Sequence, residues 1–210
     1  MLFRSDIATL GRAIIRDYPD RYPLYSMREF TWNKIRQPNR NGLLFRDPSV
    51  DGVKTGMTDA AGYCLVSSAK RDGMRLVAVV MGTKSMKARE DASLALLNYG
   101  FGFYETRVLQ KGGTRLAGQR IYKASGGQAD VGLARDLVVT LPRGVADRVE
   151  IHVEPASRVF APLTAADRTG VVRAVLDGKV IAEAALQPLA DVPTGNIFRR
   201  IWDTILSWFA

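Results

Sequence analysis

The sequence lacks several features that mark whole classes of protein. It has one cysteine, Cys64, so no disulfide can form within the chain. No stretch approaches the roughly 20 apolar residues of a membrane-spanning helix. The first residues turn polar at Arg4, too soon for the apolar core of an export signal. We therefore exclude a disulfide scaffold and a helical membrane span, and we expect no signal peptide in this chain.

Metal and cofactor ligands are equally scarce. The single histidine, His152, alternates with Ile151 and Val153, which on a strand points it away from the apolar face. No group of His, Cys or carboxylate residues has the spacing of metal ligands, and there is no glycine-rich phosphate loop. We expect no bound metal and no cofactor.

Clustered positive charge is also missing, although 30 Lys and Arg residues outnumber 21 Asp and Glu residues and leave a net charge of +9. The basic residues alternate with acidic ones, whereas a nucleic-acid-binding surface concentrates Lys and Arg beside aromatic residues. We expect no nucleic-acid partner. The alternative, binding to nucleic acid through the net charge, predicts an affinity that falls steeply with salt.

The first 103 residues combine helix and hairpin patterns. Apolar residues at helical spacing predict the helices, and a turn at Asp72-Gly73 predicts that the strands on either side form a hairpin. The expected elements are a helix at 5–18, a loop-rich stretch at 20–50 with a short strand at 30–32, strands at 62–69 and 75–81, and a helix at 84–99 that backs the hairpin.

After residue 103 the sequence changes to short runs of alternating hydrophobicity separated by turn residues. Such runs predict a small all-β sandwich or barrel. The expected strands are 106–110, 114–122, 136–141 and 148–154, with 171–186 folded at Asp177-Gly178. We place the domain boundaries so that 1–103, 104–190 and 191–210 are separate parts.

The last part is a strongly amphipathic segment. On a helical wheel at about 100° per residue, its apolar and polar residues take opposite halves. The apolar half consists of Ile197, Phe198, Ile201, Trp202, Ile205, Leu206, Trp208 and Phe209. A helix of this length reaches only about 20 Å, so it could lie in a membrane interface with Arg199 and Arg200 toward the headgroups but could not span a bilayer. The alternative is a final helix docked on its own domain.

One short motif carries chemistry, Lys54-Thr55-Gly56 within the run Val50 to Tyr63. With the Asn39-Arg40-Asn41 segment and the strand of Arg75 to Gly82, it resembles the C-terminal part of the catalytic domain of the low-molecular-mass penicillin-binding proteins, the serine D-alanyl-D-alanine carboxypeptidases. The β-rich segment and the amphipathic tail also resemble that family, so the resemblance covers nearly the whole chain.

The resemblance implies an α+β fold. It consists of the C-terminal part of a penicillin-binding-protein or β-lactamase-like catalytic domain, a small all-β sandwich-like domain and an amphipathic helix. It also implies that Lys54, Thr55 and Gly56 bind substrate, with Arg40 and Arg89 supporting the substrate carboxylate or ordering the site. The implied partners are peptidoglycan pentapeptide stems, β-lactams for the full-length enzyme and the membrane surface at the periplasmic face of the cytoplasmic membrane.

The family's nucleophile is the missing part. Its serine and base lysine stand well before the Lys-Thr-Gly strand, and only 53 residues precede Lys54. The one Ser-x-x-Lys match, Ser67 to Lys70, lies on a predicted strand, where side chains three residues apart point to opposite faces. We therefore expect no catalytic nucleophile and no activity from this chain alone. The competing hypothesis is a non-catalytic, membrane-tethered β-sandwich that binds or positions cell-wall partners.

Overall fold

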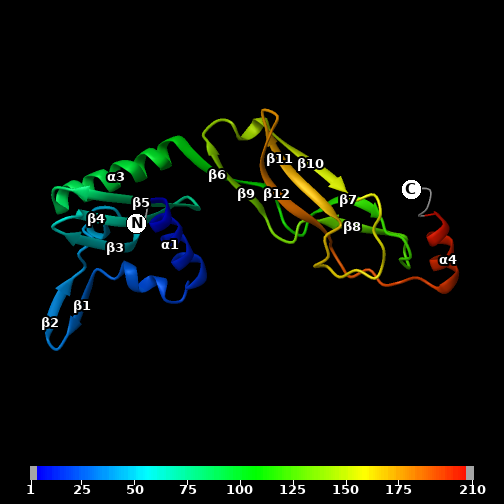
Figure 1. Cartoon of the computed structure of the whole chain (residues 1–210), viewed down its shortest axis with the longest axis horizontal. Coiled ribbons are helices and arrows are strands. Elements are labelled where there is room, and N and C mark those ends of the chain that lie inside the picture. Colours follow the sequence, from blue (N-terminus) through cyan, green and yellow to red (C-terminus); the bar gives the residue numbers. More distant parts are fainter. Residues whose placement is uncertain (1–3, 207–210) are drawn as a thin grey trace. The chain divides into compact units, whose positions relative to one another are not determined.

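The computed structural model describes residues 4–206, apart from the side chain of Ile205. The chain divides into two compact units, Met1–Glu105 and Thr106–Ala210 (Figure 1). Sheets dominate both units and helices flank them, which confirms the α+β fold class.

The first unit is built on a three-stranded antiparallel sheet with the strand order β3-β4-β5. Its strands are β3 (Val50–Thr58), β4 (Gly62–Arg71) and β5 (Met74–Thr83). The hairpin predicted for β4 and β5 is confirmed. Its two turn residues, Asp72 and Gly73, have φ of 48° and 81°, as a tight hairpin turn requires.

Two helices cover opposite faces of this sheet, α1 (Arg4–Asp17) and α3 (Met86–Phe103). Leu97 and Phe101 of α3 pack in the core formed by one face, whereas Gly11 of α1 lies against Val66 and Val77 on the other. Figure 1 shows the sheet between them. Both predicted helices are confirmed, and so is the packing of the second, α3, against the hairpin. The sequence pattern did not predict that α1 covers the opposite face of the sheet.

The stretch expected to be loop-rich contains more structure than predicted. Its elements are the 3-10 helix η1 (Tyr22–Ser26), β1 (Glu29–Trp32), β2 (Ile35–Pro38) and the short helix α2 (Leu43–Arg46). The predicted aromatic strand pairs with β2, which we did not predict because its polar residues and terminal proline obscure a strand pattern. Asn33 and Lys34 make the turn at φ 49° and 65°, and an asparagine favours such a conformation.

The second unit contains a five-stranded antiparallel sheet in the order β10-β11-β12-β8-β7 and the two-stranded sheet β6-β9. The strands are β6 (Tyr104–Gln110), β7 (Arg115–Arg120), β8 (Gln128–Gly132), β9 (Leu137–Pro142), β10 (Val149–Pro155), β11 (Gly170–Leu176) and β12 (Lys179–Pro188). A one-turn 3-10 helix, η2 (Ala146–Arg148), precedes β10, and helix α4 (Ile197–Leu206) follows β12.

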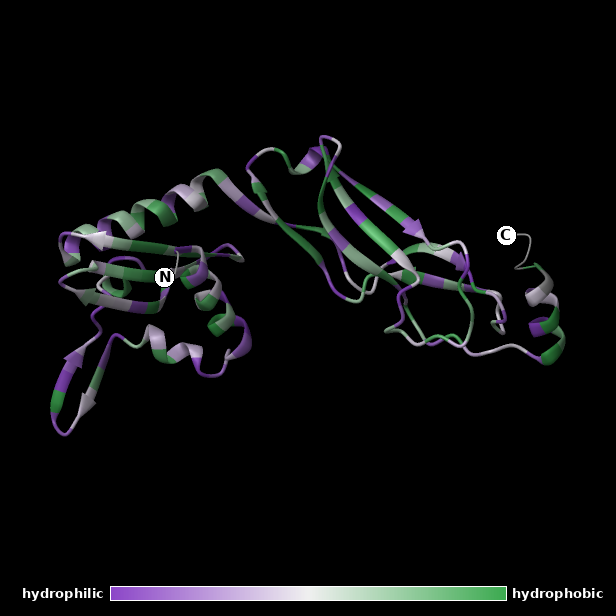
Figure 2. Cartoon of the chain, viewed as in Figure 1, coloured by the Kyte–Doolittle hydropathy of each residue, from purple (hydrophilic) through white to green (hydrophobic). Residues whose placement is uncertain are grey.

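Figure 2 shows hydrophobic and hydrophilic residues mixed along the strands of the second unit. In β9, Leu137, Val139 and Leu141 are buried and the residues between them are exposed. The five predicted strand segments are confirmed. We missed β8, because its sequence Gln-Ala-Asp-Val-Gly holds one large apolar residue. That residue, Val131, packs with Leu186 in the core.

Replacing Leu186 with alanine tests this core. The side chain is fully buried, and a buried leucine-to-alanine change costs about 2–5 kcal/mol because it leaves a cavity. We expect urea denaturation followed by circular dichroism to show such a loss in the second unit. Val180→Ala, on the same strand at 55% exposure, is the control and should cost less than about 1 kcal/mol. Equal losses for both variants would contradict the assigned core.

Candidate functional site

The Lys-Thr-Gly motif lies on β3, the outer strand of the three-stranded sheet. Because β3 pairs only with β4 in the part of the chain that the structure describes, the backbone along its other edge has no neighbouring strand. Lys54 and Gly56 are exposed and Thr55 is partly buried. An edge strand can bind an extended peptide through its backbone N–H and C=O groups, and its side chains can bind the ends of that peptide.

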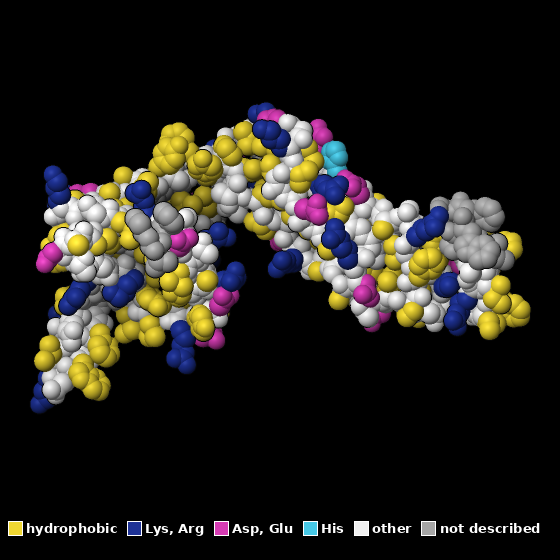
Figure 3. Space-filling view, in the orientation of Figure 1, with side chains coloured by type: hydrophobic (Ala, Val, Ile, Leu, Met, Phe, Trp, Pro, Cys, Tyr) yellow, Lys and Arg dark blue, Asp and Glu magenta, His cyan; other side chains and the backbone are white. Residues whose placement is uncertain are grey.

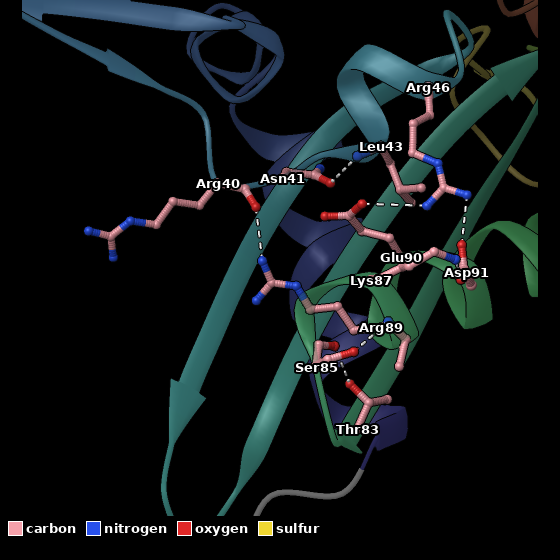
Figure 4. Close-up of polar contacts among 11 residues, drawn as sticks. Arg40, Asn41, Leu43, Arg46, Thr83, Ser85, Lys87, Arg89, Glu90 and Asp91 are labelled. Carbon is pink, nitrogen blue, oxygen red and sulfur yellow. Dashed lines mark hydrogen bonds and ion pairs between the residues drawn. The ribbon is translucent and has the colours of Figure 1, made fainter.

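The segment before β3 is held to it by a buried asparagine. Asn41 is 2% exposed, and its Nδ2 donates to the Gly52 carbonyl of β3 at 3.0 Å. Its Oδ1 accepts from the backbone N–H of Leu43 at 3.3 Å, at the start of α2. The amide therefore fixes the Arg40 position relative to the candidate strand (Figure 4).

Arg89 reaches the same segment from α3. The residue is buried, at 3% exposure, and Nη2 donates to the backbone carbonyl of Arg40 at 2.9 Å. The guanidinium also lies 5.8 Å from the ring of Tyr63 on β4, and among the described residues Nε has no hydrogen-bond partner. The side chain of Arg40 is exposed and points away from Arg89 in Figure 4. Of the two predicted arginines, Arg89 is thus placed to order the Arg40 segment through its backbone.

A second set of hydrogen bonds supports the start of β3. Asp47 accepts from the Ser49 hydroxyl at 2.6 Å and from Nη2 of Arg71 on β4 at 2.5 Å. Burial acts to raise the pKa of Asp47, but the hydrogen bonds from Ser49 and Arg71 outweigh it and hold the pKa below its ordinary value. The ionised carboxylate therefore ties the turn before β3 to its neighbouring strand.

The other candidate nucleophiles, Ser67 and Cys64, lie on β4 beside the motif strand, where Cys64 pairs with Gly56 and Ser67 with Val53. Ser67 is fully buried, with its hydroxyl 3.5 Å from the Ala78 carbonyl, whereas Lys70 is exposed. They do not form a serine-lysine pair. Cys64 is partly buried near the start of β4, where Sγ lies 3.5 Å from the Ala61 carbonyl.

The remaining polar candidate is His152. It is exposed on β10, as predicted, with Nε2 3.0 Å from Glu150 Oε2. Within residues 4–206, no three His, Cys, Asp or Glu side chains gather as a metal site would need.

Helix α4 is a second candidate site, and it docks on the second unit through its polar face. Asp203 is 5% exposed and accepts from the backbone N–H of Lys123 at 2.6 Å, while Arg199 Nη1 donates to the Ser125 carbonyl at 3.1 Å. The helix is therefore attached to its own domain, one of the two predicted alternatives. Arg199, expected to face headgroups, has one nitrogen committed to that attachment.

The apolar face of α4 remains in solvent. Its exposed side chains are Ile197 at 64%, Phe198 at 80%, Ile201 at 58% and Trp202 at 63%. Leu206 is partly buried. Three of the predicted membrane-contacting side chains, Ile205, Trp208 and Phe209, lie outside the described part. None of the described helices has the length and apolar character needed to cross a membrane.

Comparison with known proteins gives two family matches. A model for D-alanyl-D-alanine carboxypeptidase, peptidase family S11, matches residues 4–85, and one for the C-terminal domain of penicillin-binding protein 5 matches residues 104–194. The D-alanyl-D-alanine carboxypeptidase DacA of Escherichia coli K12 is 42% identical over 206 residues, covering 97% of this chain and 51% of that protein. DacC of the same organism is 38% identical, covering 98% and 54%.

A solved structure agrees. Penicillin binding protein 5 from Haemophilus influenzae matches with a TM-score of 0.79 at 43% identity, covering 90% of this chain and 56% of that one. The chain spans about half the length of the curated relatives it matches.

The hydrogen bonds that Asp47 accepts predict a loss of stability in acid. A carboxyl whose pKa is lowered by folding stabilises the protein above its ordinary pKa of 3.8, and that stability is lost as the pH falls toward the folded-state pKa. At neutral pH we expect Asp47→Asn to cost about 1–3 kcal/mol, and to cost less as the pH falls below about 4. Denaturation curves at pH 7 and pH 3 measure this. Asp59→Asn, on the exposed turn after β3, is the control, and an Asp47→Asn cost that does not shrink in acid would contradict the assignment.

Proposed function

The chain belongs to the D-alanyl-D-alanine carboxypeptidase family, and from this premise we propose that it supplies the substrate-binding strand of a serine-type D-Ala-D-Ala carboxypeptidase. The reaction removes the terminal D-Ala from peptidoglycan pentapeptide stems: a serine attacks the penultimate D-Ala carbonyl, D-Ala leaves, and water hydrolyses the acyl-enzyme. The same site takes β-lactams in the full-length enzyme. The observation that carries the proposal is the exposed Lys-Thr-Gly motif on an unpaired strand edge.

We infer a role for each proposed residue. The Lys54 ammonium, which donates to the Thr55 carbonyl at 2.7 Å, turns to the terminal carboxylate of the peptide, and the Thr55 hydroxyl donates to the same group. Gly56 lets the peptide backbone lie close against β3. Arg89 holds the Arg40 segment in place, and the Arg40 side chain adds positive charge at the rim of the site.

We assign no nucleophile among the described residues, 4–206. Ser67 is fully buried, whereas Lys70, the lysine of its Ser-x-x-Lys match, is exposed. The chain therefore recognises the stem without cleaving it, and the acylating serine and its base belong to the family's longer catalytic domain.

Exposed α4 supports membrane association as the second part of the proposal. Four apolar side chains, two of them aromatic, face solvent on a helix whose polar face is already occupied. Such a helix lies in the membrane interface and keeps the domain at the outer, periplasmic face of the cytoplasmic membrane. The competing function is a membrane-tethered β-domain without catalysis. Exposed α4 supports that function equally, but that function gives no stem-binding role to the Lys-Thr-Gly strand.

Binding of a peptide ending in D-Ala-D-Ala tests the strand. We expect NMR titration to shift the amide signals of β3, and Lys54→Gln to weaken binding about tenfold or more, because it removes a charge-assisted hydrogen bond. Lys70→Gln, an exposed lysine on β4, is the matched control. A peptide with an amidated C-terminus should not bind. Equal affinity of the Lys54 and Lys70 variants would refute the assignment.

Vesicle flotation tests the helix. Each exposed aromatic side chain that enters the interface contributes about 1.5–3 kcal/mol, so the double variant Phe198→Ser and Trp202→Ser should lower the vesicle partition coefficient roughly 100-fold or more. The variant Phe30→Ser and Trp32→Ser removes the same residue types from exposed positions on β1 and is the control. Flotation that both variants lower alike would contradict a specific role for α4.

A further inference from the structure

A cleft of about 670 Å³ opens between α4 and the loops of the second unit beside it. Its walls come from the end of β7, from the loop that follows it, from the segment before the helix and from the helix itself. The lining residues are Arg120, Ser125, Thr194, Gly195, Asn196, Phe198, Arg199, Trp202, Asp203 and Leu206. The cleft therefore joins the docked polar face of α4 to its exposed apolar face.

Two arginines and one carboxylate charge the cleft. Arg120 and Arg199 have side chains 53% and 43% exposed, whereas that of Asp203 is 7% exposed. Asp203 lies 3.8 Å from Arg120 and 4.0 Å from Arg199, but its short hydrogen bond, 2.6 Å, is to the backbone N–H of Lys123. With five N–H donors on each guanidinium, the arginines keep donors that can point into the open cleft.

Both arginines pack against other groups of the second unit. The guanidinium of Arg120 lies 4.7 Å from the centre of the Tyr122 ring. That of Arg199 packs over Gly127, where an added Cβ would lie 2.0 Å from Nη2. Positioned guanidinium groups recognise phosphate better than mobile ones, because less side-chain entropy is lost on binding.

The rim of the cleft is apolar. Phe198 and Trp202 line it and are 80% and 63% exposed. Figure 3 shows basic and hydrophobic side chains side by side at the end of the second unit that carries α4. A cationic floor with an apolar rim fits a molecule with an anionic head and an acyl tail, whereas a soluble anion would leave the aromatic rim unused.

We propose that this cleft binds the phosphodiester headgroup of an anionic phospholipid, with Arg120 and Arg199 on the phosphate and Phe198 and Trp202 against the acyl chains. The proposal rests on the membrane association proposed above and deepens it. The β-domain, through Arg120, takes part in choosing the lipid, so lipid selection is not a property of the amphipathic helix alone.

Arg120→Gln is the variant that tests the cleft, because Arg199 also holds the helix to the Ser125 carbonyl. Arg135→Gln is the matched control, since it removes the same charge from an exposed residue beside Gly112, before β9. Sedimentation of the full chain with vesicles of phosphatidylcholine, with or without one-quarter phosphatidylglycerol, measures the partition coefficient. Thermal unfolding checks that both variants fold.

We expect the wild-type chain to bind the phosphatidylglycerol vesicles more tightly than pure phosphatidylcholine. Arg120→Gln should lower partition into the anionic vesicles about five- to tenfold, and Arg135→Gln less than about twofold. Equal losses for the two variants, or equal wild-type binding to both vesicles, would overturn the headgroup site and leave the membrane role standing. Binding to neither vesicle would overturn the membrane role itself. Arg120-dependent binding of inorganic phosphate, without selective binding to anionic vesicles, would assign the cleft to a soluble anion.

Discussion

The candidate site depends on the outer edge of β3, which no described strand covers. A backbone edge is a peptide-binding surface only if the strand is held straight and in register, and here the support comes from the segment before it. Asn41 bonds to the Gly52 carbonyl, and Asp47 ties the preceding turn to Arg71 of β4. Since both contacts lie at the start of β3, the Lys-Thr-Gly half of the strand remains accessible.

Buried polar groups position both candidate sites. Arg89 inside the first unit reaches a backbone carbonyl beside the strand, and Asp203 at the second unit reaches a backbone N–H of the β-domain. A charged group with this little exposure is costly unless it is hydrogen-bonded. Each contact therefore favours one arrangement: the Arg40 segment next to β3, and α4 with its apolar face turned outward.

Much of the fold follows from the hydrophobic pattern. The hairpin around Asp72-Gly73, the helix that carries Arg89 and the alternation in β9 are local signals, and periodicity predicts them well. By contrast, β8 has one large apolar residue and is recognised only once Val131 meets Leu186 in the core. Such a strand forms because it pairs with strands that are distant in the sequence. The local hydrophobic pattern carries no information about that pairing.

The sites were predictable to a similar extent. The Lys-Thr-Gly motif and the apolar half of α4 are visible in the sequence. That Arg89 is buried and contacts the backbone of Arg40 is not visible, because a helical position gives no information about a partner 49 residues away. A helical wheel likewise separates Phe198 from Asp203 without saying which side docks, and here the polar side does.

The most direct test of the account is an intermolecular NOE measurement on the chain in complex with a peptide ending in D-Ala-D-Ala. We predict NOEs between the methyl group of the terminal D-Ala and the protons of Thr55 and Gly56, as an extended peptide along β3 requires. NOEs only to residues away from β3, from a peptide that binds in a carboxylate-dependent way, would contradict the claim that this strand recognises the stem.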